Sequence, residues 1–268
     1  MTNVVFMVNL PETKKPGRSN SYQYSERSWK FYCDRTDSEL FVLTERIWPE
    51  DRMNANWHKI YALQLLEANG IDYDKVLIVD GDTIVHPMAP NIFDVVGDKF
   101  YAVHNDGSYD WMLRSMENYS HHMFNGFTFP FTRYFNSGFI VINRRFKGFF
   151  DDAIQFYTLN QDRIRAMQQN YGVGTDQPVL NFLVQTKIPD ELEILPYEWN
   201  MQELPRREVL NLEMTFVHYG WVYHFNGIHP DFKVLQADNT PAVEQWMSYV
   251  YTQLYSNIDE TKLALGIQ

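Results

Sequence analysis

The chain has 268 residues, of which 45% are hydrophobic and 21% are charged, and its formal net charge at pH 7 is −11. These values are typical of a globular protein with a large core, and they exclude extended disorder. The acidic balance also argues against a nucleic-acid-binding protein, because phosphate recognition needs a basic surface unless a divalent cation bridges the charges.

The first 80 residues alternate between strand-like and helix-like patterns. Short apolar runs predict strands at residues 4–10 (VVFMVNL), 40–44 and 75–80 (KVLIVD). Helical spacing of apolar residues predicts helices at residues 21–35 and 57–68, the second capped by Asn56. This order predicts an α/β fold with a mainly parallel, Rossmann-like central sheet flanked by helices. Ligands bind such sheets beyond the carboxyl ends of the strands.

The same reasoning extends to the rest of the chain, which we expect to form one domain over residues 1–268. Strands are predicted at residues 100–104, 138–143, 192–195 and 216–225, and helices at residues 149–167, 175–184 and 241–255. Residues 105–134 are aromatic-rich and predicted to be irregular, as an insertion or lid within the domain. The last helix carries Trp246, Tyr249 and Tyr251, which serve either the core or an oligomer interface.

The cysteine content and the lengths of the apolar segments indicate the cellular compartment of the protein. Cys33 is the only cysteine, which rules out an internal disulfide and suits a reducing compartment. The amino-terminal apolar run is too short for a signal peptide, and no window approaches the roughly 18 apolar residues of a membrane span. We therefore expect a soluble, cytoplasmic protein with no membrane span.

The strongest chemical signal is the sequence Asp80-Gly81-Asp82, which directly follows an apolar strand. At a strand end, with a glycine between them, both carboxylates can turn toward one hard cation. Mg²⁺ and Mn²⁺ prefer such oxygen ligands and commonly bridge carboxylates to substrate phosphates. The alternative is a capped turn, because Asp-Gly is a common turn dipeptide.

Two histidines are candidates to complete a cation site. His224 precedes Gly227, where backbone could approach a phosphate, and His218 lies six residues earlier. Spacing does not separate the two, and a packed core histidine is the alternative for either. Lys59 lies on the helix before the Asp-x-Asp strand, where it is either functional or a solvated surface lysine. Lys233 is a weaker candidate of the same kind.

Polar groups also begin two later elements. Asn136 and Ser137 place an amide and a hydroxyl at the amino end of a buried strand, unless they only form a turn. Asp176 and Gln177 open a helix just after Thr175. Capping explains one polar residue there but not the pair, which could hydrogen-bond hydroxyls or assist the departure of a leaving group.

Taken together, the motifs resemble the GT-A-fold glycosyltransferases, most closely glycosyltransferase family eight, the glycogenin and galactosyltransferase-like group. The resemblance rests on five blocks in the family's order: Lys59 before KVLIVDGDTIV, FNSG at 135–138, DQ at 176–177 with LN at 180–181, LP at 195–196 with WN at 199–200, and HFNG at 224–227. These blocks span most of the chain, and their joint occurrence by chance is improbable.

The resemblance implies a GT-A fold, a UDP-sugar donor, Mn²⁺ (or Mg²⁺) and transfer with retention of anomeric configuration. It implies Asp80, Asp82 and His224 as metal ligands. It implies Lys59, Asp176 and Gln177 as catalytic residues around the donor sugar. The residues implied to contact the donor are Val8, Asn9, Asp80, Gly81, Asn136, Ser137, Gly227 and Lys233.

Two departures from the family pattern concern the nucleotide. The family has Lys-Pro-Trp soon after its glycine, whereas this chain reads IHPDFK, so the lysine at the diphosphate is either displaced to Lys233 or absent. The amino-terminal nucleotide block is longer and more basic than the family's, and Tyr22 or Tyr24 is the candidate to stack on the base.

The function that follows is metal-dependent transfer of a hexose to a glycan, lipid-linked or protein acceptor. The aromatic segment either faces that acceptor, through Trp111 or Phe131, or forms a compact hydrophobic lid or part of the core. Two alternatives stay open: a sugar-nucleotide nucleotidyltransferase and a non-catalytic carbohydrate-binding protein on the same fold. The nucleotidyltransferase would carry a glycine-rich basic loop after the first strand, and NLPETKKPGR is only a faint version of one.

Overall fold

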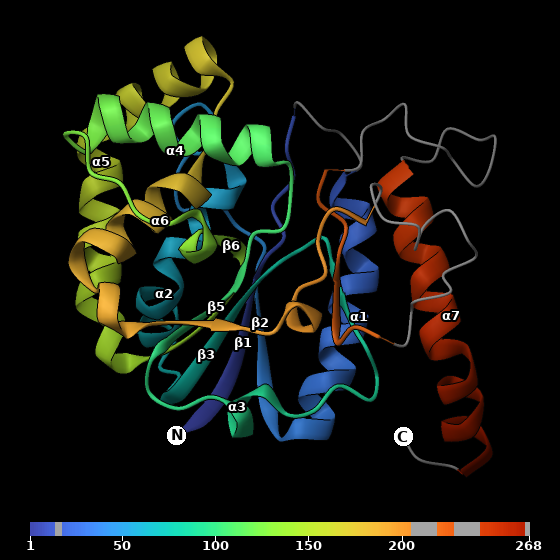
Figure 1. Cartoon of the computed structure of the whole chain (residues 1–268). Coiled ribbons are helices and arrows are strands. Elements are labelled where there is room, and N and C mark those ends of the chain that lie inside the picture. Colours follow the sequence, from blue (N-terminus) through green and yellow to red (C-terminus); the bar gives the residue numbers. More distant parts are fainter. Residues whose placement is uncertain (14–17, 205–218, 228–241, 266–268) are drawn as a thin grey trace.

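The computed structural model describes residues 1–13, 18–204, 219–227 and 242–265 (Figure 1). The strands are β1 (Thr2–Val8), β2 (Ser38–Leu43), β3 (Tyr73–Asp80), β4 (Thr83–Val85), β5 (Phe100–His104), β6 (Phe135–Asn143), β7 (Leu192–Leu195) and β8 (Val222–His224). The α-helices are α1 (Arg18–Thr36), α2 (Ala62–Ala68), α3 (Ile92–Val95), α4 (Tyr109–Met123), α5 (Lys147–Tyr171), α6 (Asp176–Lys187) and α7 (Ala242–Leu265). Short 3₁₀ helices cover Ala55–Tyr61, Phe131–Arg133, Arg144–Phe146, Pro189–Glu191 and Tyr197–Trp199.

Within the described residues, six strands form the central sheet in the order β2-β1-β3-β6-β5-β7. β1 pairs in parallel with β2 and β3, and β5 pairs in parallel with β7. β6 runs antiparallel to both of its neighbours, β3 and β5. The predicted α/β fold with a mainly parallel central sheet is therefore confirmed.

Helices cover both faces of this sheet, as Figure 1 shows. One face packs on a large apolar cluster that includes residues of α2, α5 and α6, and the other packs on Trp29, Tyr32 and Cys33 of α1. Because β6 is covered on both faces, all nine of its residues are buried. In the described part of the chain, no helix combines the length and the apolar character of a membrane span.

The carboxyl-terminal helix α7 lies beside α1 (Figure 1) and joins a third apolar cluster, which includes Ile84 of β4 and Tyr223 of β8. Trp246 of α7 is buried in that cluster, whereas Tyr249 and Tyr251 pack at its edge. Trp246 therefore belongs to the core.

Three local expectations differ from the structure. Residues 105–134 are not irregular throughout, because Tyr109–Met123 forms α4. Its buried residues, Met112, Ser115, Tyr119 and Ser120, recur at helical spacing, a pattern that the aromatic-rich composition of the segment obscured. The helix expected from residue 57 begins earlier, as a 3₁₀ helix at Ala55, so Asn56 does not cap it. The strand expected over residues 216–225 is seen as β8, and residues 216–218 lie outside the described part.

The strand directions bring distant polar residues to one edge of the sheet. Val8 and Asp80 are register partners at the carboxyl ends of β1 and β3. Because β6 is antiparallel, its amino end, which carries Asn136 and Ser137, lies at the same edge. β8 pairs with β4 so that His224 lies opposite Thr83, one residue after Asp82. This edge carries the candidate site.

Candidate active site

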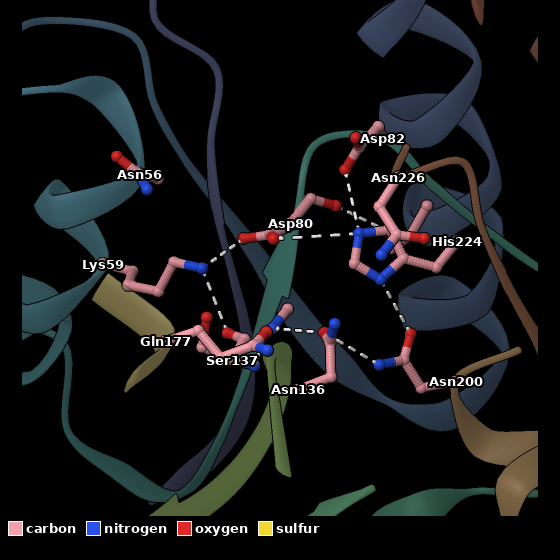
Figure 2. A network of polar contacts seen from close by, with 12 residues as sticks. Asn56, Lys59, Asp80, Asp82, Asn136, Ser137, Gln177, Asn200, His224 and Asn226 are labelled. Carbon is pink, nitrogen blue, oxygen red and sulfur yellow. Dashed lines mark hydrogen bonds and ion pairs between the residues drawn. The ribbon is translucent and has the colours of Figure 1, made fainter. Parts of the chain in front are cut away.

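Asp80, Asp82 and His224 form a cluster at the carboxyl end of β3. One ligand atom from each residue can be chosen so that all three lie within 4.8 Å of one another. The Nε2 atom of His224 lies 3.2 Å from Oδ1 of Asp82 and 3.8 Å from Oδ2 of Asp80. Figure 2 shows the imidazole between the two carboxylates and Asn200. We call these three residues the carboxylate–histidine cluster.

A hydrogen-bond chain fixes the orientation of the His224 ring. The backbone N–H of Gly138 donates to Oδ1 of Asn136 at 2.8 Å, so that atom is an acceptor and takes the Nδ2–H of Asn200 at 3.1 Å. The Oδ1 of Asn200 then faces Nδ1 of His224 at 3.1 Å and accepts its proton. In neutral His224 this leaves the lone pair of Nε2 directed at the carboxylates, as a metal ligand requires.

The cluster closes around Gly138, where any side chain would force the neighbouring side chains to shift. A Cβ at that position would lie 2.5 Å from Cε1 of His224 and 2.7 Å from Oδ2 of Asp80. The missing side chain therefore lets β6 pass close to the cluster. The FNSG motif supplies both this glycine and the Asn136 amide that orients Asn200.

Lys59 is buried and extends from the 3₁₀ helix toward the cluster. Its ammonium contacts Oδ1 of Asp80 at 2.5 Å, Oδ2 of Asp176 at 3.2 Å and the carbonyl of Ser137 at 3.1 Å. Burial alone would lower the pKa of Lys59, but Asp80 and Asp176 raise it above its ordinary value. Lys59 is therefore a charged group whose three donors all meet protein oxygens, rather than a solvated surface lysine.

Asp176 lies buried at the first turn of α6 and accepts four hydrogen bonds. Oδ1 accepts from Asn56 and Thr175, and Oδ2 accepts from the hydroxyl of Ser137 at 2.9 Å and from Lys59. Burial would raise the pKa of Asp176, but Lys59 and these hydrogen bonds hold it below its ordinary value. We call Asn56, Lys59, Ser137 and Asp176 the buried network. Asn56 is the member that sequence reasoning assigned to a different role.

Gln177 connects the buried network to the chain of asparagines. Its Oε1 accepts the backbone N–H of Ser137 at 3.1 Å, and its Nε2 donates to Oδ1 of Asn105 at 3.1 Å. Asn136 donates to the same atom of Asn105 at 3.2 Å. Asn105 thus joins two predicted site residues, although no sequence motif marked it. It immediately follows β5, whose carboxyl end lies at the same edge.

Helix α1 contributes two side chains that contact the Asp-x-Asp segment. Arg18 donates from Nη2 to Oδ2 of Asp82 at 2.9 Å. The ring of Tyr22 covers Gly81 so closely that a Cβ there would lie 2.7 Å from Cδ2 of the ring. Burial would raise the pKa of Asp82, but His224, when Nε2 also carries a proton, and Arg18 hold it well below its ordinary value. Sequence reasoning missed Arg18, whose signal was only the basic character of residues 14–18.

The remaining predicted donor residues lie near the same edge, insofar as the structure describes them. Val8 ends β1, and Asn9 donates to Glu26 at 2.5 Å beside a polar pocket of about 350 Å³ at the start of α1. Gly227 follows β8 and lies next to the carboxylate of Glu203. His218 and Lys233 lie outside the described residues.

Of the two tyrosines considered for base stacking, only Tyr22 reaches the Asp-x-Asp segment, because Tyr24 packs against Tyr251 at 5.8 Å. Trp111 of α4 packs against Gly174, two residues before Asp176. Phe131 is partly exposed and packs edge-on against Tyr109.

The donor set of the cluster fits a hard divalent cation. Two carboxylates and one imidazole, with the second nitrogen of the imidazole held by Asn200, are ligands that Mn²⁺ accepts and Mg²⁺ accepts in part. Across the described residues, this is the one group of three or more such side chains close enough to share an ion.

Comparison with known families decides the class of protein. The family described as glycosyl transferase family 8 matches residues 20–230, which is most of the chain. The chain belongs to glycosyl transferase family 8. Every predicted site residue except Val8, Asn9 and Lys233 falls inside the matched range, and the family-8 assignment makes the chain a glycosyltransferase. No curated protein matches this family-8 chain in sequence.

Solved structures support the GT-A fold of this family-8 protein. A glycosyltransferase involved in the glycosylation of the major capsid of PBCV-1 superposes with a TM-score of 0.58 at 11% identity, covering 92% of this chain and 100% of that one. The glycosyltransferase GlyE of Streptococcus pneumoniae TIGR4 superposes with a TM-score of 0.51 at 16% identity. That alignment covers 99% of this chain and 65% of GlyE.

Proposed function

We propose that the chain is a metal-dependent, retaining hexosyltransferase that takes its sugar from a UDP-sugar. The observation that carries the proposal is the convergence of Asp80 Oδ2, Asp82 Oδ1 and His224 Nε2 at the carboxyl ends of the parallel strands. In α/β sheets that edge is where ligands bind. Family membership argues against the nucleotidyltransferase alternative.

The carboxylate–histidine cluster would hold the cation. When bound there, Mn²⁺ or Mg²⁺ supplies Lewis-acid neutralisation of the charge that develops on the departing diphosphate. Asn200 keeps His224 in the required orientation, and Lys59 holds one oxygen of Asp80. These protein contacts form the site in advance, so that little reorganisation is needed during the reaction.

The buried network would stabilise positive charge on the donor sugar. Asp176 is ionised, and both of its oxygens already accept hydrogen bonds, which favours an electrostatic role over nucleophilic attack. Gln177 and Asn136 extend the polar surface, and we assign the orientation of sugar hydroxyls to their amide groups.

The other donor contacts follow from position along the edge. Val8 and Asn9 end β1 beside α1, where we place the base, and Tyr22 offers a ring next to Gly81. Gly81 lies between the two aspartates, Ser137 precedes Gly138 at the cluster, and Gly227 follows His224 by three residues. We assign contacts with the diphosphate to these three residues. We also propose that Lys233 contacts the diphosphate.

The acceptor would enter past the segment of residues 105–134, which we propose acts as an insertion over the site. Trp111 and Phe131 lie on it, and sugar rings pack well on aromatic faces. A glycan, a lipid-linked sugar or a protein side chain could serve as this acceptor. We also propose that the protein is cytoplasmic and that it can form oligomers.

The test is transfer and hydrolysis of a panel of UDP- and GDP-sugars, with Mn²⁺ and with a chelator. We expect turnover only with metal, and Asp82→Asn should lower it at least about 100-fold, because the variant loses charge stabilisation at the leaving group. NMR of the first product should show the anomeric configuration of the donor.

Asp74→Asn is a matched control, because Asp74 is exposed near the other end of β3. Its turnover should equal that of the wild type. Full activity of Asp82→Asn or of the chelated enzyme would contradict the metal role, and release of pyrophosphate would contradict the reaction class. Absence of both transfer and hydrolysis across the panel would favour a non-catalytic carbohydrate-binding protein.

A further inference from the structure

Two basic side chains reach the carboxylate–histidine cluster, and they differ in how many donors they have left. The ammonium of Lys59 has three N–H donors, and three protein oxygens take them: Asp80, Asp176 and Ser137. The Lys59 side chain is only 3% exposed. Lys59 therefore shapes the site but has no donor to spare for a ligand.

Arg18 has donors to spare. Of the five N–H donors on a guanidinium, only one, on Nη2, bonds to a residue of the described ranges, namely Asp82. Its Nε is buried and makes no hydrogen bond to any described residue. A buried donor without an acceptor is costly, so this position favours a ligand that brings an oxygen.

The position of Arg18 matches an anion that a cation holds in the cluster. Asp82 gives Oδ2 to Arg18 and turns Oδ1 toward His224, so the guanidinium borders the carboxylate that would hold the metal. The Arg18 side chain is 32% exposed, whereas that of Asp82 is 7% exposed, so the arginine lies on the open side of the pair. A planar guanidinium can bond a carboxylate and a phosphate oxygen together.

We propose that Arg18 binds the diphosphate of the nucleotide-sugar donor, with Nη2 on Asp82 and its remaining N–H groups on phosphate oxygens. The assignment rests on the proposed function, because it needs a nucleoside diphosphate at the cluster. It adds a charged ligand-binding residue from α1, the helix that also carries Tyr22.

The experiment measures two affinities by calorimetry, for Mn²⁺ alone and for UDP in saturating Mn²⁺, in the wild type and in Arg18→Met. Loss of the guanidinium should weaken UDP binding about tenfold, since charge-assisted hydrogen bonds to phosphate are lost. Binding of Mn²⁺ alone should stay within about twofold or become tighter, because the variant removes a positive charge next to Asp82. A residue that only held Asp82 in place would weaken both affinities equally.

Arg27→Met is the matched control, because Arg27 is an exposed arginine on the same helix. It should leave both affinities within about twofold of the wild type, as a surface charge far from the ligand does. Arg18→Lys keeps the charge without the planar fork and guards against misfolding of the methionine variant. It should weaken UDP binding about threefold.

Wild-type UDP affinity in both Arg18 variants, or equal weakening of UDP and Mn²⁺ binding, would overturn the assignment alone. Failure of the wild type to bind any of UDP, GDP or ADP with Mn²⁺ would overturn the proposed function and the assignment together. These two failures are distinguishable, because the first is seen in the variants and the second in the wild type.

Discussion

In the carboxylate–histidine cluster, Asp80 and Asp82 each give one oxygen to a basic side chain and turn the other toward His224. In the buried network, Asp176 gives both of its oxygens to protein donors. The two regions lie side by side, and Lys59 of the buried network also contacts Asp80 of the cluster (Figure 2).

The difference shows that the acidic residues of this site have two roles. Some can bind a ligand, and others stabilise the folded protein. A carboxylate with one oxygen not bonded to the protein can bind a ligand. The side chain of Asp80 is also 30% exposed, so a ligand can reach it. A buried carboxylate with every oxygen paired keeps its charge and its position without a ligand. The buried network should therefore govern stability, and the cluster should govern metal affinity.

The largest expected effect on stability comes from Lys59→Met. The change leaves Asp176 as a buried charge without its ionic partner, which should cost about 3–5 kcal/mol in the free energy of unfolding. Lys30→Met is a suitable control, because Lys30 pairs with Asp34 at the surface and should cost less than about 1 kcal/mol. Urea denaturation measures both changes, and equal costs would contradict a stabilising role for the buried network.

Asn200→Leu should act mainly on the cluster. Without the Asn200 side chain, His224 loses the partner that fixes its ring, and Mn²⁺ affinity should fall about tenfold, as for other residues that orient a metal-ligating histidine. Calorimetric titration of Mn²⁺ measures the change.

Asn105→Leu is the matched control for this prediction. Asn105 is buried in the same chain of amides and bonds Asn136 and Gln177, but no hydrogen bond joins it to His224. Its Mn²⁺ affinity should stay within about twofold of the wild type, because the ligand histidine keeps its partner. A similar loss of Mn²⁺ affinity in both variants would contradict a specific role for the bond between Asn200 and His224.

The smallest expected effect is the dependence of the free energy of unfolding on pH. Because the pKa of Asp176 is lower in the folded protein, its stabilising contribution is complete above the ordinary value of 3.8 and is lost as the pH falls through the folded value. The advantage of the wild type over Asp176→Asn should therefore shrink by about 1 kcal/mol per pH unit below pH 4. Denaturation at pH 6, 4 and 3 measures it, and parallel curves would contradict the prediction.

Sequence reasoning named the residues of the candidate site that local motifs carry. Asp80 and Asp82 stand out because they end an apolar strand, and Asn136, Asp176 and His224 because their blocks follow in a known order. The sheet could be predicted for the same reason, since buried parallel strands read as continuous apolar runs.

The residues that sequence reasoning missed reach the site through tertiary packing. Asn56 has the residue type of a helix cap, but its side chain donates to Thr175 and Asp176 across the site. Arg18 meets Asp82 only because α1 packs along β4. None of these contacts has a signature in the local sequence.

The packing of Tyr22 on Gly81 has a consequence for how this chain can evolve. A side chain at position 81 would overlap the ring, so the middle residue of Asp-x-Asp is set by helix α1 as much as by the turn. Among homologues, a larger residue at position 81 should therefore appear together with a smaller one at position 22. The two positions would then covary, although they are distant in sequence.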